Sequence, residues 1–120
     1  MANEIEKVFS KGHESIIVIG NDTPQISTDL LLQASKKLIT SDWALGNSAD
    51  GGFYLIGLHK GNFNKASFIS QAWETEYLQA SFAHYLEETG QTAVLLPTFT
   101  DYDHFTVLQP LLAELSANHE

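Results

Sequence analysis

The chain has 120 residues, the length of one domain, and its 43% hydrophobic composition suffices for one packed core. It contains no Cys, which excludes disulfide scaffolds, thiol catalysis and cysteine-ligated zinc, and no apolar run approaches the roughly twenty residues of a membrane helix. Six Lys, no Arg and fifteen Asp or Glu give a formal net charge of −9, so the chain lacks the basic face that nucleic-acid binding requires.

The first third of the chain predicts a helix, a strand and a second helix. Apolar residues at helical spacing before Gly12 predict a helix over residues 2–11. The β-branched run 15–19 predicts a strand buried on both faces, followed by a loop over residues 21–24. Ser27 is a favourable N-cap for a helix that carries its apolar stripe to position 38.

The middle of the chain predicts a β-hairpin. Residues 43–47 and 52–58 have strand composition, and the dipeptide Asp50-Gly51 between them favours a tight turn. Residues 61–64 then form a loop.

The last third predicts a long helix, a short strand and a final helix. The helical stripe covers residues 72–88, and residues 92–96 form a strand that Pro97 stops. Asp103 could cap a helix through residue 115, which Pro110 should interrupt. The alternation of helices and strands predicts an α/β fold in which helices cover a mixed sheet.

Three acidic loops follow predicted strands, where open α/β sheets bind ligands. Asp22, and the alternating pair Asp101 and Asp103, could hold a divalent cation, although an Asx-turn for Asp22 and helix capping in a solvated loop for the pair are the commoner roles of such residues. In the hairpin, Asp50 could accept a hydrogen bond from a sugar hydroxyl, and Gly51 and Gly52 would let a ligand approach the backbone; an ordinary turn is the simpler alternative.

Two further features of the sequence bear on whether these loops bind a ligand. Trp73 could stack on a ligand ring or anchor the core, and packing is the commoner role of a large aromatic residue. Residues 66–120 hold eight acidic residues and no Lys or Arg, so a phosphorylated ligand would need a divalent cation or another chain to balance its charge.

Taken together, four segments resemble one family. These are IIVIGNDTPQIS (16–27), LGNSADGGFYLIGL (45–58), AWETEYL (72–78) and LLPTFTDYDHFTVLQPL (95–111). They are similar to bacterial transferase-like proteins of the nucleotide-diphospho-sugar transferase superfamily, in the radical-SAM/selenodomain-associated group. The hairpin sequence, DGG followed by an aromatic residue, is the most specific part of the resemblance.

The resemblance implies a three-layer GT-A-like fold and transfer of a glycosyl or nucleotidyl group with Mg²⁺ or Mn²⁺. It places Asp22 at the metal- and nucleotide-facing aspartate, Asp101 and Asp103 at a late acidic segment that can add a metal ligand, and Asp50, Gly51 and Gly52 at the acceptor or sugar pocket. Trp73 is a further substrate-binding candidate, through the stacking role given above. No catalytic residue is assigned.

The chain also departs from the family pattern. Family members begin with a strand and a Gly-, Lys- and Arg-rich loop that cradles the nucleotide, and this sequence begins after that point, as if truncated at its N-terminus. Three readings stay open: a transferase completed by a partner chain or by self-assembly, a non-catalytic ligand- or protein-binding remnant, and an open reading frame that starts late.

The apparent truncation also predicts an assembly. The strand over residues 16–19 would lose its neighbours and expose a backbone edge, and exposed edges pair with other chains. We therefore expect a homo-oligomer or a partner chain over this edge, and, since no export signal precedes the domain spanning residues 1–120, a cytoplasmic location.

Overall fold

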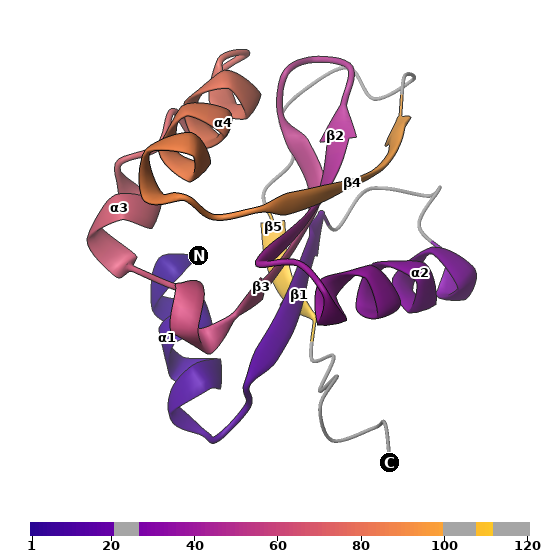
Figure 1. Ribbon diagram of the computed structural model, residues 1–120, viewed down its shortest axis with the longest axis vertical. Coiled ribbons are helices and arrows are strands. Elements are labelled where there is room, and N and C mark those ends of the chain that lie inside the picture. The colour runs from indigo at the N-terminus through magenta and orange to yellow at the C-terminus, as the bar shows by residue number, and fades with distance from the viewer. Residues whose placement is uncertain (21–26, 100–107, 112–120) are drawn as a thin grey trace.

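A central sheet lies between two layers of helices in the computed structural model, which describes residues 1–20, 27–99 and 108–111 (Figure 1). The elements in chain order are α1 (Ala2–Ser10), β1 (Ser15–Gly20), α2 (Thr28–Ile39), β2 (Trp43–Ser48), β3 (Phe53–His59), the 3₁₀ turn η1 (Lys60–Asn62), α3 (Lys65–Ile69), α4 (Leu78–Thr89), β4 (Ala93–Phe99) and β5 (Leu108–Leu111). The predicted α/β class with a mixed sheet is confirmed.

Within the described residues the sheet has five strands, in the order β4-β2-β3-β1-β5. β3 is antiparallel to both β1 and β2, and β4 is parallel to β2. Consequently β1, β2 and β4 run in the same direction, and their carboxyl ends lie at the same end of the sheet. We call this end, with the β2–β3 turn at residues 48–53, the hairpin end.

The expected open edge on β1 is not observed. β5 pairs antiparallel with β1 on the side away from β3, with Val18 opposite Pro110. The pairing also corrects the expectation of a helix over residues 103–115, since Leu108–Leu111 form a strand. Backbone pairing with β1 outweighs the helical spacing of the apolar residues there.

The face of the sheet beneath α1, α3 and α4 has an aromatic core. Phe82 of α4 lies at its centre and is 1% exposed. Its ring makes edge-to-face contacts, at centroid distances of 5.2 to 6.4 Å, with Trp43, Phe53, Phe68, Trp73 and Tyr85. Such pairs add to the stability gained from the buried apolar area.

The opposite face is covered by α2 and has an aliphatic core. Its buried residues are Ile17, Leu30, Ala34, Leu38, Ala44, Tyr54, Leu55 and Leu96. β3 therefore contributes to both cores, which explains why almost every residue of this strand is buried. The expectation that β1 is buried on both faces is also confirmed, since Ile17 lies in the aliphatic core and Ile16 and Val18 lie in the aromatic core.

Local signals placed most helix ends correctly. The Ser27 hydroxyl oxygen accepts a hydrogen bond from the Leu30 N–H at 3.2 Å and caps α2 as predicted. α4 ends at Gly90, which adopts the left-handed conformation with φ 70°.

Two further predictions about the last third of the chain were wrong. The helix expected from residue 72 begins only at Leu78, because residues 72–77 form turns in which Glu74 has φ 61° and the Thr75 hydroxyl donates to the Ala72 carbonyl. The strand expected to stop at Pro97 continues to Phe99. β4 is an edge strand with a register shift near Pro97, and both features accommodate a residue without an N–H.

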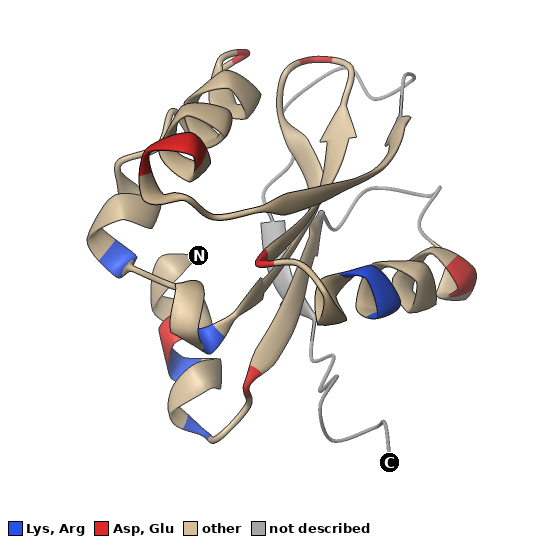
Figure 2. Ribbon diagram, viewed as in Figure 1, with Lys and Arg blue, Asp and Glu red and all other residues tan. Residues whose placement is uncertain are grey.

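Basic side chains lie away from the hairpin end. The six Lys residues belong to α1 and the turn after it, α2, η1 and α3. Figure 2 shows no basic residue on the β2–β3 hairpin and an acidic residue at its tip. Among the described helices, none is long and apolar enough to cross a membrane.

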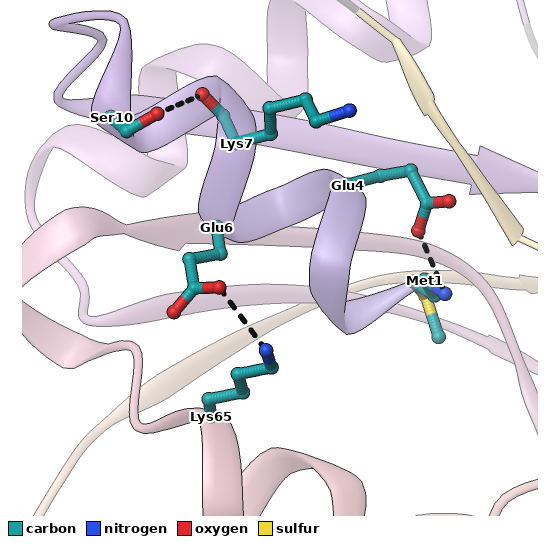
Figure 3. Close-up of polar contacts among 6 residues, drawn as sticks. All are labelled: Met1, Glu4, Glu6, Lys7, Ser10 and Lys65. Carbon is teal, nitrogen blue, oxygen red and sulfur yellow. Dashed lines mark hydrogen bonds and ion pairs between the residues drawn. The ribbon is translucent and has the colours of Figure 1, made fainter.

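Two ion pairs lie on the surface of α1 (Figure 3). Lys65 Nζ of α3 is 3.1 Å from Glu6 Oε1, which links α3 to α1. The N-terminal ammonium is 2.9 Å from Glu4 Oε1, and its hydrogen bond lowers the pKa of that carboxyl group. Because both glutamates and Lys65 are exposed, these pairs contribute little, and packing rather than charge holds α1 on the sheet.

Candidate functional site

The β2–β3 turn is held by its own hydrogen bonds. The Ser48 N–H donates to the Gly52 carbonyl at 2.9 Å, and the Gly51 N–H donates to the Ser48 carbonyl at 3.2 Å. Asp50 Oδ1 accepts from the Ser48 hydroxyl at 2.6 Å and from the Gly52 N–H at 3.1 Å. These four bonds fix the orientation of the Asp50 carboxylate on the turn.

Gly51 brings the turn into close contact with the segment that precedes α4. Its φ is 97°, and a Cβ added to it would overlap the carbonyl oxygen of Glu76. The Gly51 carbonyl in turn accepts from the Gln79 N–H at 3.0 Å. Glycine is thus required here both by the backbone conformation and by the lack of space.

An open pocket of about 590 Å³ lies where these two segments meet. It is lined by Ala49, Asp50, Gly51, Glu76 and Tyr77. Tyr77 is 63% exposed, so an aromatic ring is available at the surface beside the two acidic side chains. The lining offers hydrogen-bond acceptors and an aromatic face, which suit a ligand with hydroxyl groups better than a phosphate.

Two buried side-chain oxygens near the turn have no hydrogen-bond partner within the described part of the chain. They are Asp50 Oδ2 and Asn47 Oδ1, and both lie within the β2–β3 hairpin. A buried acceptor without a donor costs about 1–3 kcal/mol, and more when it is charged. Native proteins keep few such groups, and a bound ion or ligand can supply the missing partner.

The three metal candidates lie outside the described residues, but the ends of the strands that precede two of them are described. Asp22 is two residues beyond Gly20, the last residue of β1, and Asp101 is two residues beyond Phe99, the last residue of β4. Asp103 follows Asp101 in the same segment. Residues 1–20, 27–99 and 108–111 by themselves hold no group of three Asp, Glu or His positioned for a metal ion.

A protein-family model matches the first part of the chain. Residues 1–75 match the model described as "Uncharacterized protein conserved in bacteria (DUF2064)". The chain belongs to this family.

The fold is shared with a solved protein from Desulfovibrio desulfuricans G20. The crystal structure of that protein, described as a "putative nucleotide-diphospho-sugar transferase", superposes with a TM-score of 0.77 and 27% sequence identity. The match covers 87% of this DUF2064 chain and 45% of the other chain, so this chain spans less than half of its relative. No protein of curated function matches the sequence significantly.

Trp73 of this DUF2064 chain lies in the aromatic core. Its ring centroid is 4.8 Å from that of Phe68, and its indole N–H donates to the Phe68 carbonyl at 2.6 Å. The side chain therefore anchors the 72–77 segment to α3, in agreement with the packing role weighed from the sequence.

Sequence reasoning did not identify Gln79 or the Glu76–Tyr77 pair as part of the site. The resemblance includes the segment 72–78, but its apolar spacing predicts only the start of a helix. No local pattern shows that the start of α4 contacts the hairpin, because the Gln79 bonds join residues 27 and 31 positions apart.

Proposed function

We propose that this DUF2064 chain forms the acceptor-side part of a glycosyl- or nucleotidyltransferase of the nucleotide-diphospho-sugar transferase type. One observation carries the proposal: β1, β2 and β4 end at the same end of the sheet, and an Asp follows each end within two residues. Ligands of open α/β sheets bind at the carboxyl ends of strands. The similarity to the Desulfovibrio protein agrees with this reaction class.

Asp50 is the substrate-binding residue of this proposal. Oδ1 is occupied within the turn, whereas Oδ2 has no donor among the described residues, so a ligand hydroxyl would complete its hydrogen bonding. Gly51 and Gly52 keep the backbone beside this carboxylate free of side chains.

A divalent cation belongs to the same proposal. Asp22, Asp101 and Asp103 are the residues that would hold Mg²⁺ or Mn²⁺, and their carboxylate oxygens are the ligands these ions prefer. The chemistry supplied by the ion is neutralisation of the diphosphate charge. This contribution matters here because the chain has no Arg and the described hairpin end has no Lys.

The remaining donor contacts would come from outside these 120 residues. The chain matches 45% of its solved relative, so we propose that the nucleotide-binding part is supplied by a second copy, a partner chain or further residues of a longer cytoplasmic protein. Membership of the radical-SAM/selenodomain-associated group is likewise a proposal, which rests on the sequence pattern.

A non-catalytic domain that binds a ligand or a protein is the second candidate. The observation that favours it is the absence of basic side chains from the described hairpin end. Transfer from a nucleotide-sugar requires positioning and charge stabilisation of the phosphates, and carboxylates alone provide little of either.

Isothermal titration separates the two candidates. The wild-type chain is titrated with UDP-, GDP-, CDP- and dTDP-sugars, with and without Mn²⁺, beside Asp22→Asn and Asp50→Asn. The transferase proposal predicts Mn²⁺-dependent binding of one donor that Asp22→Asn abolishes. Binding of none of the donors by a folded chain would contradict it and favour the second candidate.

A further inference from the structure

Gln79, in the first turn of α4, is joined to the β2–β3 turn by three hydrogen bonds. Its side-chain Nε2 donates to the Ser48 carbonyl and to the Gly52 carbonyl, each at 2.7 Å. Its backbone N–H donates to the Gly51 carbonyl at 3.0 Å. One residue thus contacts the turn before, at and after its tip.

The backbone bond also supplies a cap for α4. The N-cap residue, Tyr77, makes no side-chain capping bond, and the first N–H groups of a helix have no partner within it. The Gly51 carbonyl accepts from one of these groups, so the turn caps the helix while Gln79 holds the turn. The two elements consequently fix one another's position.

We infer that Gln79 is a positioning residue that holds the β2–β3 turn, and with it the Asp50 carboxylate, in the orientation needed for ligand binding. The carboxylate is fixed relative to Ser48 and Gly52 by its own bonds, and Gln79 binds the carbonyls of the same two residues. Rotation of the turn on the sheet would therefore require both Gln79 bonds to break. The ligand-binding part of this inference rests on the proposed function.

The experiment compares Gln79→Met with the matched control Gln91→Met. The Met side chain keeps the length of Gln79 and removes its two donors. Each carbonyl retains a backbone donor, Gly51 N–H for Ser48 and Ser48 N–H for Gly52, so the variant should fold. Gln91 accepts from the Trp43 indole N–H at 2.6 Å at the opposite end of the sheet, so its replacement removes a part-buried side-chain hydrogen bond elsewhere.

Amide hydrogen exchange and the Asp50 side-chain ¹³Cγ resonance, both measured by NMR, are readouts that need no ligand. We expect Gln79→Met to accelerate exchange at Gly51 and Gly52 about tenfold and to shift the Asp50 resonance, because both side-chain hydrogen bonds that hold the turn to α4 are lost. Gln91→Met should do neither. Gln79→Asn, whose amide is one methylene too short to reach both carbonyls, should behave as Gln79→Met does.

Three results would overturn the inference. These are unchanged exchange in Gln79→Met, equal acceleration in Gln91→Met, and wild-type affinity for the donor in Gln79→Met when Asp50→Asn loses it. If the wild type binds none of the donor panel, the proposed function fails, and exchange together with the Asp50 resonance still decides whether Gln79 positions the turn.

Discussion

The two ends of the sheet satisfy their polar groups in different ways. At the end opposite the hairpin, the His59 imidazole joins β1, β3 and α2. Its Nε2–H donates to the Leu38 carbonyl at 2.8 Å and the Ser41 carbonyl at 3.0 Å, and Nδ1 is 2.6 Å from the Ser15 hydroxyl. A carbonyl oxygen can only accept, so the two carbonyl partners place a proton on Nε2, and Nδ1 lies within hydrogen-bond distance of the Ser15 hydroxyl.

At the same end of the sheet, other hydrogen bonds join segments that are far apart in the sequence. Asp42 Oδ2 accepts from the Thr92 N–H at 2.8 Å, and the Trp43 indole donates to Gln91. At the hairpin end, by contrast, Asp50 Oδ2 and Asn47 Oδ1 are buried and have no donor from the described residues. The first end therefore stabilises the fold, and the unpaired acceptors at the second agree with the ligand site proposed there, since unpaired buried acceptors lower stability unless something binds them.

The largest expected effect comes from filling the space between the turn and the Glu76 carbonyl. Gly51→Ala should lower the free energy of unfolding by about 3 kcal/mol, because it combines a positive φ with a backbone overlap. Gly12→Ala is the matched control, since Gly12 has φ 105° and nothing within 4 Å of its added Cβ. Gly12→Ala should lower the free energy of unfolding by about 1 kcal/mol. Urea titration measures both, and equal losses would show that the turn does not pack as described.

The comparison between the ends predicts opposite responses to removal of a polar group. His59→Ala leaves two carbonyls without their side-chain donor and should lower the free energy of unfolding by about 2 kcal/mol, with ligand binding unchanged. Asp50→Asn keeps the hydrogen bonds at Oδ1 and replaces the unpaired carboxylate oxygen with a neutral amide group. It should change the free energy of unfolding by less than about 0.5 kcal/mol. We expect the same variant to lose ligand binding. A larger loss of stability in Asp50→Asn than in His59→Ala would contradict the claim that the His59 end, rather than the hairpin end, stabilises the fold.

A smaller effect is expected at alkaline pH from Tyr54, which lies beneath α2 and donates to the Pro97 carbonyl at 2.7 Å. Burial raises the pKa of Tyr54 to about 12. The unfolded chain releases the phenol proton near pH 10 and the folded chain only near pH 12, so this contribution to stability is complete below pH 10 and declines as pH rises through 12.

Tyr54→Phe isolates that contribution. At pH 8 the variant should be about 1 kcal/mol less stable than wild type because it lacks the hydrogen bond, and the difference should shrink between about pH 10 and 12. Urea titrations at about pH 8, 10 and 11.5 measure it. A difference that stays constant with pH would contradict a buried, protonated Tyr54.

Local chemistry explains which parts of the fold the sequence predicted. The strand over 15–19, the Ser27 cap, the hairpin around Asp50-Gly51 and the helix end at Gly90 depend on neighbouring residues, and all four are confirmed. The helix start at Leu78 and the extension of β4 past Pro97 depend on contacts with distant segments, which no local pattern encodes.

The same distinction applies to the candidate site. The sequence identified Asp50, Gly51 and Gly52 because turn chemistry is local. It did not show that Gln79 binds the Ser48, Gly51 and Gly52 carbonyls or that Glu76 packs on Gly51, because these contacts join the hairpin to the start of α4. The roles of Asp22, Asp101 and Asp103, which lie beyond the described residues, stay predictions.

The central claim is that ligand binds at the hairpin end, and NMR chemical-shift mapping tests it most directly. ¹⁵N-labelled chain is titrated with Mg²⁺ and with each nucleotide-sugar of the panel. We predict that amide shifts concentrate at residues 47–52 and 76–79, with none at Ser15, Ser41 or His59. Shifts confined to the Ser15–His59 end, or no shift at the hairpin end with any donor, would contradict it.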